Sequence, residues 1–231
     1  MRILALDAAT EACSVSLWCD GRESGRSGES GKRGAAQILA MIEQALAEAQ
    51  LPLSALDAIA SSIGPGAFTG VRISVAVAQG LAFGADIPVI PVTTLEALAF
   101  QAVQAGAPRA MACLDARMGE VYWGCFAADA ERGLISRVAP AVGPPDSVVL
   151  PSDGPYQGIG RGLASYPALC ELPGMATHDA MKRALPQARE IARLGALRFT
   201  LGAAIDPALL TPLYLRDKVA LTTAERAARS Q

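Results

Sequence analysis

The sequence contains a single histidine, His178, and this is the first of several shortages that limit its chemistry. No cysteine or second histidine lies near it at the spacing of metal ligands. A Ser-His-Asp hydrolase, a histidine-ligated zinc or iron centre and a histidine-based acid–base enzyme are therefore all difficult to build. Because Gly and Pro flank this stretch, we interpret His178 as structural or solvated, and we predict neither a metal site nor a catalytic group.

Paired cysteines and long apolar runs are missing as well. The five cysteines are scattered, odd in number and contain no CxxC pair, which argues against a disulfide framework or a structural zinc site. The most apolar stretch, residues 73–85, is broken by Ser74 and Gln79 and is too short to span a bilayer. The start, MRILALDAAT, lacks the long apolar core of a secretory signal. We therefore expect a cytoplasmic protein with no membrane partner.

Neither sign of charge is in excess. Lys and Arg total 20 against 22 Asp and Glu, which gives a net charge of −2 with histidine neutral. Binding of nucleic acid by a protein's own surface needs a dense basic footprint, so any contact with RNA has to be shared with a more basic protein. Apolar residues make up 52% of the chain, which supplies a large core and excludes disorder over most of the length.

The first half of the chain alternates between strand and helix patterns. A short apolar strand ends at Asp7, and Asp20-Gly21 is typical of a type I′ hairpin turn. Apolar residues then recur at helical spacing from Ala35, and Thr93 or Thr94 is a candidate cap with Glu96 in the first turn. The predicted elements are strands at 2–6 and 13–18, an edge strand or loop at 22–30, a helix from 35, a strand at 56–63, a helix at 68–83, a strand at 87–92 and a helix to 104.

After residues 106–108 the pattern restarts. Strands are predicted at 110–114, ending at Asp115, and then at 121–127 and 134–138. Residues 140–173 are rich in Pro and Gly and are expected to be irregular, whereas Pro186 is suited to the first position of a helix that ends near Thr200. Each half therefore opens with an apolar strand that ends in Asp, a pattern compatible with a diverged duplication.

The string GPGAFTGVR, residues 64–72, permits two interpretations. A glycine-rich turn before a helix can hold an anion with free backbone N–H groups, but the spacing is not that of a P-loop and no Lys follows Gly70. The interpretation we favour is a tight turn in which Thr69 caps the helix and Gly70 permits close packing. Asp7 either orients a magnesium-bound phosphate or only accepts backbone N–H bonds in its turn. The candidates for weak nucleotide binding are Asp7, Thr10, Gly64, Gly66 and Thr69.

Two further groups of residues have weaker patterns. The glycines of residues 158–162 form a cluster that is more often a loop than a ligand site. Asp115 and Arg117 could bind an acidic ligand, but an Asp–Arg pair at the end of a strand is usually a local ion pair.

The helix expected after GPGAFTGVR is apolar nearly all round. A helix in a small domain should present one face to water, so two apolar faces indicate that it is covered twice. Either a partner covers the second face, or the first helix of the same lobe does. Small residues along the helix would let another helix approach closely. The candidate residues for a partner interface are Ile38, Ile42, Ala45, Ser74, Val75, Ala78, Leu81 and Ala82.

Four segments resemble, in order, the motifs of the TsaB family, also called YeaZ. They are MRILALDAATEACSVSL, LDAIASSIGPGAFTGVRISVAVAQGLAFGADIPVIPVTTLEAL, CLDARMGEVYW and PLYLRDKVA. The resemblance is almost continuous over the first half and patchy in the second. Two features depart from the family pattern: GKRGAA at residues 31–36 replaces a His followed by Ser or Thr, and Ala40 replaces a usual Pro.

The resemblance implies a two-lobed actin-like ATPase fold of the RNase-H-like, ASKHA type, an α/β architecture of mixed sheets flanked by helices. Residues 1–105 would form the lobe with the partner-binding helices. Residues 106–221 would form a smaller lobe whose C-terminal helix is a candidate to cross back to the first, and residues 222–231 a flexible tail.

The same resemblance implies a non-catalytic subunit of the complex that adds threonylcarbamoyl to the adenosine next to the anticodon of tRNAs reading codons that start with A. Its partners would be TsaD, TsaE through TsaD, and a second copy of itself when alone, with tRNA bound only through the complex. No cofactor is expected on the chain itself, whereas ATP and Mg²⁺ act in the assembled complex. Two alternatives remain: an independent phosphotransferase of the same fold, and a metallopeptidase, which the missing histidine ligands disfavour.

Overall fold

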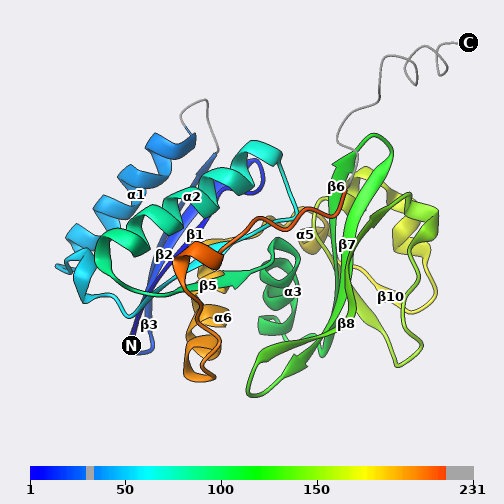
Figure 1. Ribbon diagram of the computed structural model, residues 1–231. Coiled ribbons are helices and arrows are strands. Elements are labelled where there is room, and N and C mark those ends of the chain that lie inside the picture. The colour runs from blue at the N-terminus through cyan, green and yellow to red at the C-terminus, as the bar shows by residue number, and fades with distance from the viewer. Residues whose placement is uncertain (30–33, 217–231) are drawn as a thin grey trace, which may run out of the picture.

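The computed structural model describes residues 1–29 and 34–216, which form two lobes, each built on a five-stranded mixed sheet (Figure 1). The first sheet has the order β3-β2-β1-β4-β5, in which β1 to β3 form an antiparallel meander and β4 and β5 run parallel to β1. Its strands are β1 (Arg2–Asp7), β2 (Ala12–Cys19), β3 (Arg22–Glu29), β4 (Ala58–Ser62) and β5 (Val89–Val92).

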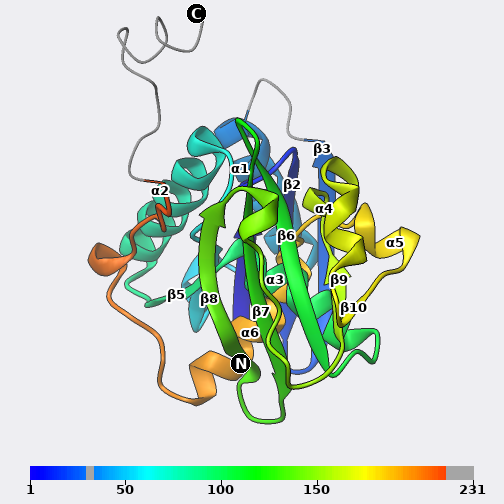
Figure 2. The same ribbon diagram turned by 90° about the vertical axis from the view of Figure 1, so that its right-hand side faces the viewer.

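The second sheet repeats this plan and faces the viewer in Figure 2. Its order is β10-β9-β6-β7-β8, again with an antiparallel meander of three strands and two parallel strands on the other side of the first. The strands are β6 (Arg109–Arg117), β7 (Glu120–Asp129), β8 (Gly133–Gly143), β9 (Tyr156–Ile159) and β10 (Met175–Ala176). The restart of the sequence pattern after residue 106 thus corresponds to a repeated topology, and the predicted two-lobed α/β fold with mixed sheets is confirmed.

Helices cover the two faces of the first sheet differently. α1 (Gly34–Glu48) and α2 (Phe68–Ala85) pack on one face, and α6 (Ala188–Thr200) packs on the other. The alternation of side chains along β1 reflects this arrangement, since Leu4 and Leu6 pack with the α1–α2 side and Ile3 and Ala5 with the α6 side. All four side chains are fully buried, so β1 is a central strand with no solvent-exposed face.

The two lobes share one hydrophobic core. α3 (Thr94–Gln104) precedes the second sheet in sequence but packs on β6 and β7, whereas α6 follows the second sheet and packs on the first. Between the sheets these helices also contact each other, as the centre of Figure 1 shows. The predicted boundary between residues 105 and 106 therefore separates the strands of the two sheets. The helices do not follow it, because α3 lies before the boundary and covers the second sheet, and α6 lies after it and covers the first. The predicted tail, 222–231, lies outside the described residues.

Polar contacts fix α3 against α6. Thr93 caps α3 as predicted, because its hydroxyl accepts the Glu96 N–H at 3.1 Å while the Glu96 carboxylate accepts the Thr93 N–H at 2.8 Å. Arg198 of α6 donates to the other Glu96 oxygen and, at 2.7 Å, to the Pro91 carbonyl. The charge-assisted bond joins the end of α6 to the start of α3 at the boundary of the shared core.

Two predicted positions were wrong. α6 begins at Ala188 rather than Pro186, since Gln187 is the N-cap and the Ala188 N–H donates to Ser14 Oγ at 2.8 Å. Residues 140–143 are not irregular but complete β8, in which Pro140 lies where the register with β7 shifts. Proline is tolerated there because β8 is an edge strand and because the regular hydrogen bonding to β7 is interrupted at the bulge, where the missing proline N–H is not required.

By length and composition alone, α2 is apolar enough to cross a membrane, with a mean hydropathy of 1.3 over its 18 residues. The predicted apolar segment was shorter because it was counted from Ile73, whereas the helix starts at Phe68. In the structure α2 packs one face on the first sheet, and 28% of it is buried. On the outer side, Ala76, Gly80, Phe83 and Gly84 are apolar or lack a side chain and are exposed in the described chain.

Two glycines give a matched test of this packing. A Cβ on Gly195 of α6 would lie 2.7 Å from the Ala60 Cβ of β4, whereas a Cβ on Gly80 of α2 would meet nothing within 4 Å. We expect Gly195→Ala to lower the free energy of unfolding by about 1–3 kcal/mol through overpacking. Gly80→Ala should raise it by roughly 0.5–1 kcal/mol, because alanine loses less entropy in a helix. Urea denaturation of both variants measures the difference, and equal values would contradict the described fit of α6 on the sheet.

Candidate functional site

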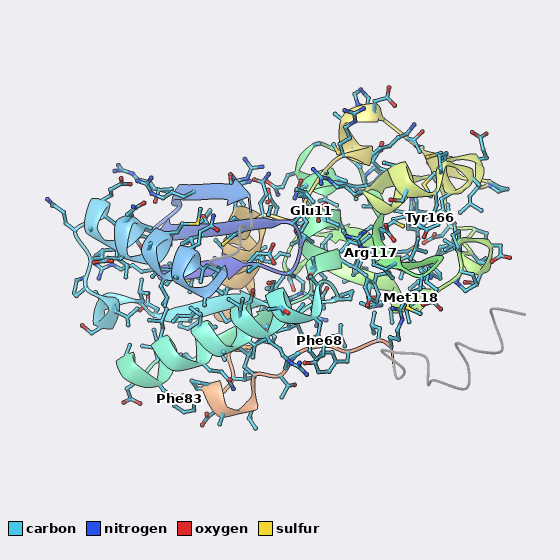
Figure 3. All side chains as sticks on the ribbon, turned by 90° about the horizontal axis from the view of Figure 1, so that it is seen from above. Glu11, Phe68, Phe83, Arg117, Met118 and Tyr166 are labelled. Atoms are coloured by element: carbon cyan, nitrogen blue, oxygen red, sulfur yellow. The ribbon has the colours of Figure 1, made fainter. Side chains whose placement is uncertain are left out.

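A cleft of about 720 Å³ lies between the two lobes. This is within the roughly 300–1,000 Å³ typical of small-molecule sites. Its walls come from the β1–β2 turn and the start of α2 in the first lobe, and from the β6–β7 hairpin and α4 (Gly162–Ser165) in the second. Figure 3 shows Glu11, Phe68, Arg117 and Met118 around this region. The lining residues are Ala9, Thr10, Glu11, Gly66, Ala67, Phe68, Leu114, Asp115, Ala116, Arg117, Met118, Tyr122, Arg161, Ser165 and Arg216.

Two ion pairs cross between elements at the cleft. Arg161 donates to Glu11 at 2.5 Å and thereby joins the second lobe to the β1–β2 turn. Arg216 pairs with Glu120 and donates to the Ala116 carbonyl at 3.1 Å. The Arg161–Glu11 pair is exposed and contributes little stability, whereas the Arg216–Glu120 pair is partly buried. Together the two pairs neutralise two of the arginines in the cleft.

The segment 205–216 carries Arg216 to this position. Its course was not predicted from the sequence, although residues 212–216 belong to the quoted motif PLYLRDKVA. Ile205 bridges Val89 at the edge of the first sheet, and Leu213 donates its N–H to the Ile63 carbonyl at 2.7 Å. In between, the Gln79 side chain of α2 donates to the carbonyls of Pro207 and Leu210. Figure 1 shows the segment, in orange and red, running beside α2 from the first lobe to the second. It has no periodicity, which is why pattern analysis could not find it.

The glycine-rich loop is closely packed rather than open. A Cβ on Gly66 would lie 2.2 Å from the Ala9 carbonyl oxygen, and one on Gly70 would lie 1.9 Å from that of Ala8. The Ala67 N–H donates to the Ala9 oxygen at 2.7 Å. The loop therefore lies directly on the β1–β2 turn, and the two elements that could together surround a phosphate are in contact with each other. This geometry agrees with the favoured interpretation of a tight turn.

Asp7 is fully buried at the end of β1. Its Oδ1 accepts the Ala9 N–H at 3.1 Å, and its Oδ2 has no hydrogen-bond partner among the described residues. Burial raises the pKa of Asp7 to about 6, although the neighbouring Ser62 hydroxyl and the Ala9 N–H lower it in part. Beside it, the Ser74 hydroxyl of α2 accepts the Ala8 N–H at 2.9 Å. Asp7 thus accepts a backbone bond in its turn and does not line the cleft.

The nucleotide-binding candidates are only partly brought together. Thr10 and Gly66 line the cleft, whereas Asp7, Gly64 and Thr69 do not. Gly64 accepts the Thr94 N–H through its carbonyl oxygen. Thr69 is exposed and is not the cap of α2, because the helix begins at Phe68 with Ala67 as its N-cap. The set remains a prediction as a binding site, but its members do not form one constellation.

The remaining candidates have structural roles in the described residues. Asp115 does not form the predicted ion pair with Arg117; its Oδ1 accepts the Arg117 backbone N–H at 2.8 Å. A Cβ on Gly160 would meet the Cys113 carbonyl oxygen at 2.2 Å, so that glycine cluster packs on β6. His178 is exposed and accepts the Ala180 N–H at the start of α5 (Asp179–Lys182). Within residues 1–29 and 34–216 no three His, Cys, Asp or Glu side chains gather as metal ligands.

The residues predicted for the partner interface are inside the first lobe, which corrects the sequence prediction at residue level. Leu81 is half-buried, and the others are buried between the helices and the sheet: Ile38, Ile42, Ala45, Ser74, Val75, Ala78 and Ala82. Helical spacing identifies a face but not its direction, and for α2 both faces are apolar. The residues predicted for the interface lie on the face of α2 that packs on the sheet, not on its outer face.

The outer face of the same two helices is exposed and apolar. We call it the α1–α2 face and define it by a set of exposed apolar residues on the two helices; exposed polar residues, among them Glu43 on α1 and Arg72 on α2, are not part of it. On α1 the largest is Leu39, which is 45% exposed, and on α2 it is Phe83, which is 60% exposed. Its small members leave the helix backbones accessible. The face comprises Ala35, Ala36, Leu39, Ala40, Ala76, Gly80, Phe83 and Gly84. Gly34 begins α1, but residues 31–33 of the divergent GKRGAA segment lie outside the described residues.

Relatives of known name match almost the whole chain. It is 37% identical to the tRNA threonylcarbamoyladenosine biosynthesis protein TsaB of Escherichia coli over 95% of this chain and 96% of that protein. It is 34% identical to the protein of the same name from Haemophilus influenzae, with 95% of each covered. The chain belongs to the TsaB family. Residues 29–144 also match the family model described as TsaD, tRNA N6-adenosine threonylcarbamoyltransferase, so TsaB and TsaD share ancestry over half of this chain.

A solved structure agrees with this assignment. YeaZ from Pseudomonas aeruginosa is 38% identical and superposes with a TM-score of 0.85, covering 93% of this chain and 99% of that one. Three of the TsaB motifs quoted from the sequence fall on β1–β2, on β4 to α3 and on β6–β7. The described part of the fourth, residues 212–216, brings Tyr214 to Phe68 and Arg216 into the cleft. The family resemblance and the two-lobed α/β fold with mixed sheets that it implied are therefore confirmed.

The charge on Asp7 can be tested through pH. Its pKa is higher in the folded chain than the ordinary 3.8, so the folded state binds the proton more tightly. Stability from this group is present below pH 3.8 and is lost as pH rises through about 6. We expect Asp7→Asn to raise the free energy of unfolding at pH 7.5 by about 1–3 kcal/mol and to flatten its decrease between these two pH values. Thermal melts across pH measure both; a destabilised variant at pH 7.5 would mean that the carboxylate has an essential partner.

Nucleotide binding can be tested on the isolated chain. Because the glycine loop lies on the β1–β2 turn, we expect millimolar Mg²⁺-ATP to leave the melting temperature unchanged. Any ligand that binds the native state at Kd far below its concentration raises stability by RT ln(1 + [L]/Kd). A titration by differential scanning fluorimetry and calorimetry measures this. Micromolar binding would restore the phosphotransferase alternative and show that the loop opens.

Proposed function

We propose that this chain is a non-catalytic subunit in threonylcarbamoyladenosine biosynthesis, which acts by pairing with a homologous TsaD-type catalytic protein. Its relatives are named for that biosynthesis, and the TsaD family model extends over half of the chain. The observation that carries the pairing is the exposed α1–α2 face. A non-catalytic role is supported by the closed glycine loop and by the burial of Asp7 away from the cleft.

The α1–α2 face has the properties of a surface that a partner covers. α2 has a mean hydropathy of 1.3 with 28% of its residues buried, and Ala76, Gly80 and Phe83 are exposed along one side of it. Ala76 and Gly80 lie one turn apart, and Phe83 continues the same side toward the end of the helix. Since TsaD-type proteins are homologous to this chain, two such faces can meet as a four-helix arrangement. The same face on a second copy accounts for a homodimer when the catalytic partner is missing.

The rest of the proposal concerns the assembled complex. TsaE joins through TsaD, ATP and Mg²⁺ act on the partner subunits, and tRNA is held by the complex rather than by this chain alone. A net charge of −2 supports that division, because the chain has no excess of cations for the phosphate backbone. The modified position is the adenosine next to the anticodon in tRNAs that read codons starting with A, and the reaction takes place in the cytoplasm.

Pairing is tested by placing a charge on the exposed face. Ala76→Arg and Gly80→Arg should remain folded but weaken association with the TsaD of the same organism by about 100-fold or more, because an unpaired cation at a desolvated helix crossing costs several kcal/mol. Co-elution on size exclusion and tRNA modification by the reconstituted complex are the measurements.

Two control variants distinguish loss of pairing from a general effect of an added arginine and from unfolding. Val149 is 70% exposed on the second lobe, so Val149→Arg should leave both folding and pairing intact. Ala78 is fully buried on the opposite side of α2, so Ala78→Arg should unfold the chain, as circular dichroism would show. Normal pairing by folded Ala76→Arg and Gly80→Arg chains would place the interface elsewhere.

A further inference from the structure

An aromatic and arginine cluster lies at the mouth of the cleft. We call Phe68, Arg72 and Tyr214 the platform. The Arg72 guanidinium lies over the Phe68 ring, 3.4 Å from its centroid, and 5.5 Å from the centroid of Tyr214. The two ring centroids are 6.1 Å apart with the planes inclined at 32°, and Arg72 Nε donates to the Tyr214 hydroxyl at 2.8 Å. Segments 142 residues apart in sequence therefore hold two rings in a fixed relation.

The platform is fixed but uncovered. Phe68 is 46% exposed and Tyr214 is 50% exposed, although both rings make ordered contacts. Met118, 56% exposed, lies across the mouth on the β6–β7 hairpin, and Figure 3 shows Phe68 and Met118 facing this region from the two lobes. Side chains that only stabilise a domain have little reason to remain half in water, so a ligand is expected to cover these rings.

The arginines around the cleft differ in whether they have an acidic partner. Arg161 and Arg216 are neutralised by Glu11 and Glu120. Within residues 1–29 and 34–216, neither Arg72 nor Arg117 has a carboxylate within ion-pair distance. Arg117 and Met118 have positive φ angles of 63° and 57°, the left-handed region that costs energy for residues other than glycine. The hairpin thus holds an unneutralised guanidinium, Arg117, in a wall of the cleft.

We propose that the platform and Arg117 bind an unpaired segment of RNA, with one base stacked on the Phe68–Tyr214 rings and the neighbouring phosphates beside Arg72 and Arg117. Aromatic rings with adjacent guanidinium groups bind single-stranded nucleic acid, because every base presents a π face. The inference rests on the proposed function, which supplies an RNA loop as the substrate, and it adds a contact from this chain to that substrate.

The charges favour RNA at this surface over an apolar protein segment. A protein partner would bury Arg72 and Arg117 and need its own carboxylates to compensate them, whereas an RNA phosphate supplies that charge directly. With only two unneutralised arginines, the contribution to affinity comes mainly from stacking. The expected salt dependence is correspondingly small: two phosphate contacts predict a slope of roughly −1.4 for log K against log salt on a single strand. The near-neutral sequence is thus compatible with the contact.

The test removes the aromatic rings of the platform while it keeps apolar side chains of similar volume. A fluorescein-labelled RNA hairpin with an unpaired loop is titrated into the chain mixed with the TsaD of the same organism, and a fully paired duplex of the same stem serves as the reference RNA. Phe68→Leu and Tyr214→Leu keep apolar volume but remove the π faces, and we expect them to weaken loop binding by about five- to 100-fold. Phe68→Trp keeps a ring and should bind the loop as the unchanged chain does. The duplex should show no difference among the variants.

A second measurement locates the contact. A loop that carries 5-bromouridine should photo-crosslink to the peptide with Phe68 or Tyr214, identified by mass spectrometry. Loop binding unaffected by the Leu variants, or no crosslink to either peptide, would overturn the inference. Leu variants that bind RNA normally but no longer co-elute with a protein partner would assign the platform to protein docking instead. If the unchanged chain fails to pair with TsaD, the proposed function fails, and the crosslink still decides the RNA contact separately.

Discussion

The packing of α3 and α6 between the two sheets is the constraint on which the rest of the structure depends. α3 belongs to the first half of the chain but covers the second sheet, and α6 belongs to the second half but covers the first sheet. Gly195 lets α6 approach Ala60 closely. The inner faces of both sheets are thereby buried in one core, and the lobes cannot separate without exposing it. Two features remain available outside this core: the α1–α2 face and the cleft between the lobes.

At the cleft, the glycine-rich loop and the β1–β2 turn lie in contact with each other. Homology to a transferase family places this chain among proteins that do chemistry on this fold, yet fold alone does not determine function. Here the glycines serve close packing, since Gly66 and Gly70 lie on the carbonyls of Ala9 and Ala8. The buried Asp7 then stabilises a turn at the expense of its own ionisation. Beside the cleft, two exposed rings, Phe68 and Tyr214, and two guanidinium groups without an ion pair among the described residues, Arg72 and Arg117, are available for recognition.

The sequence predicted most elements of the fold, because strand alternation, helical period and the capping pattern around Thr93 are local signals. The sequence did not predict which face of a helix points to the core, or which residues far apart in sequence are in contact. Ala76 and Ala78 are the same residue type on the same helix, yet Ala76 is exposed and Ala78 is buried. Only the position of the sheet distinguishes them. The cleft was not predicted from the sequence, and the segment that brings Tyr214 to Phe68 has no period to detect. Contacts between residues 142 apart cannot be inferred from local pattern.

α2 connects the two proposed recognition surfaces. Phe68 lies at its start beside the cleft and Phe83 near its end, and Figure 3 shows them at opposite ends of the helix. At 1.5 Å per residue they are about 22 Å apart along the axis. Ser74 anchors the helix by accepting the Ala8 N–H, so α2 is fixed to β1 between these ends. A partner that binds the outer face of α2 is therefore held in a defined orientation to the Phe68–Tyr214 rings. In the proposed complex, this rigid link lets a subunit without catalytic groups determine where an RNA loop lies relative to the catalytic subunit.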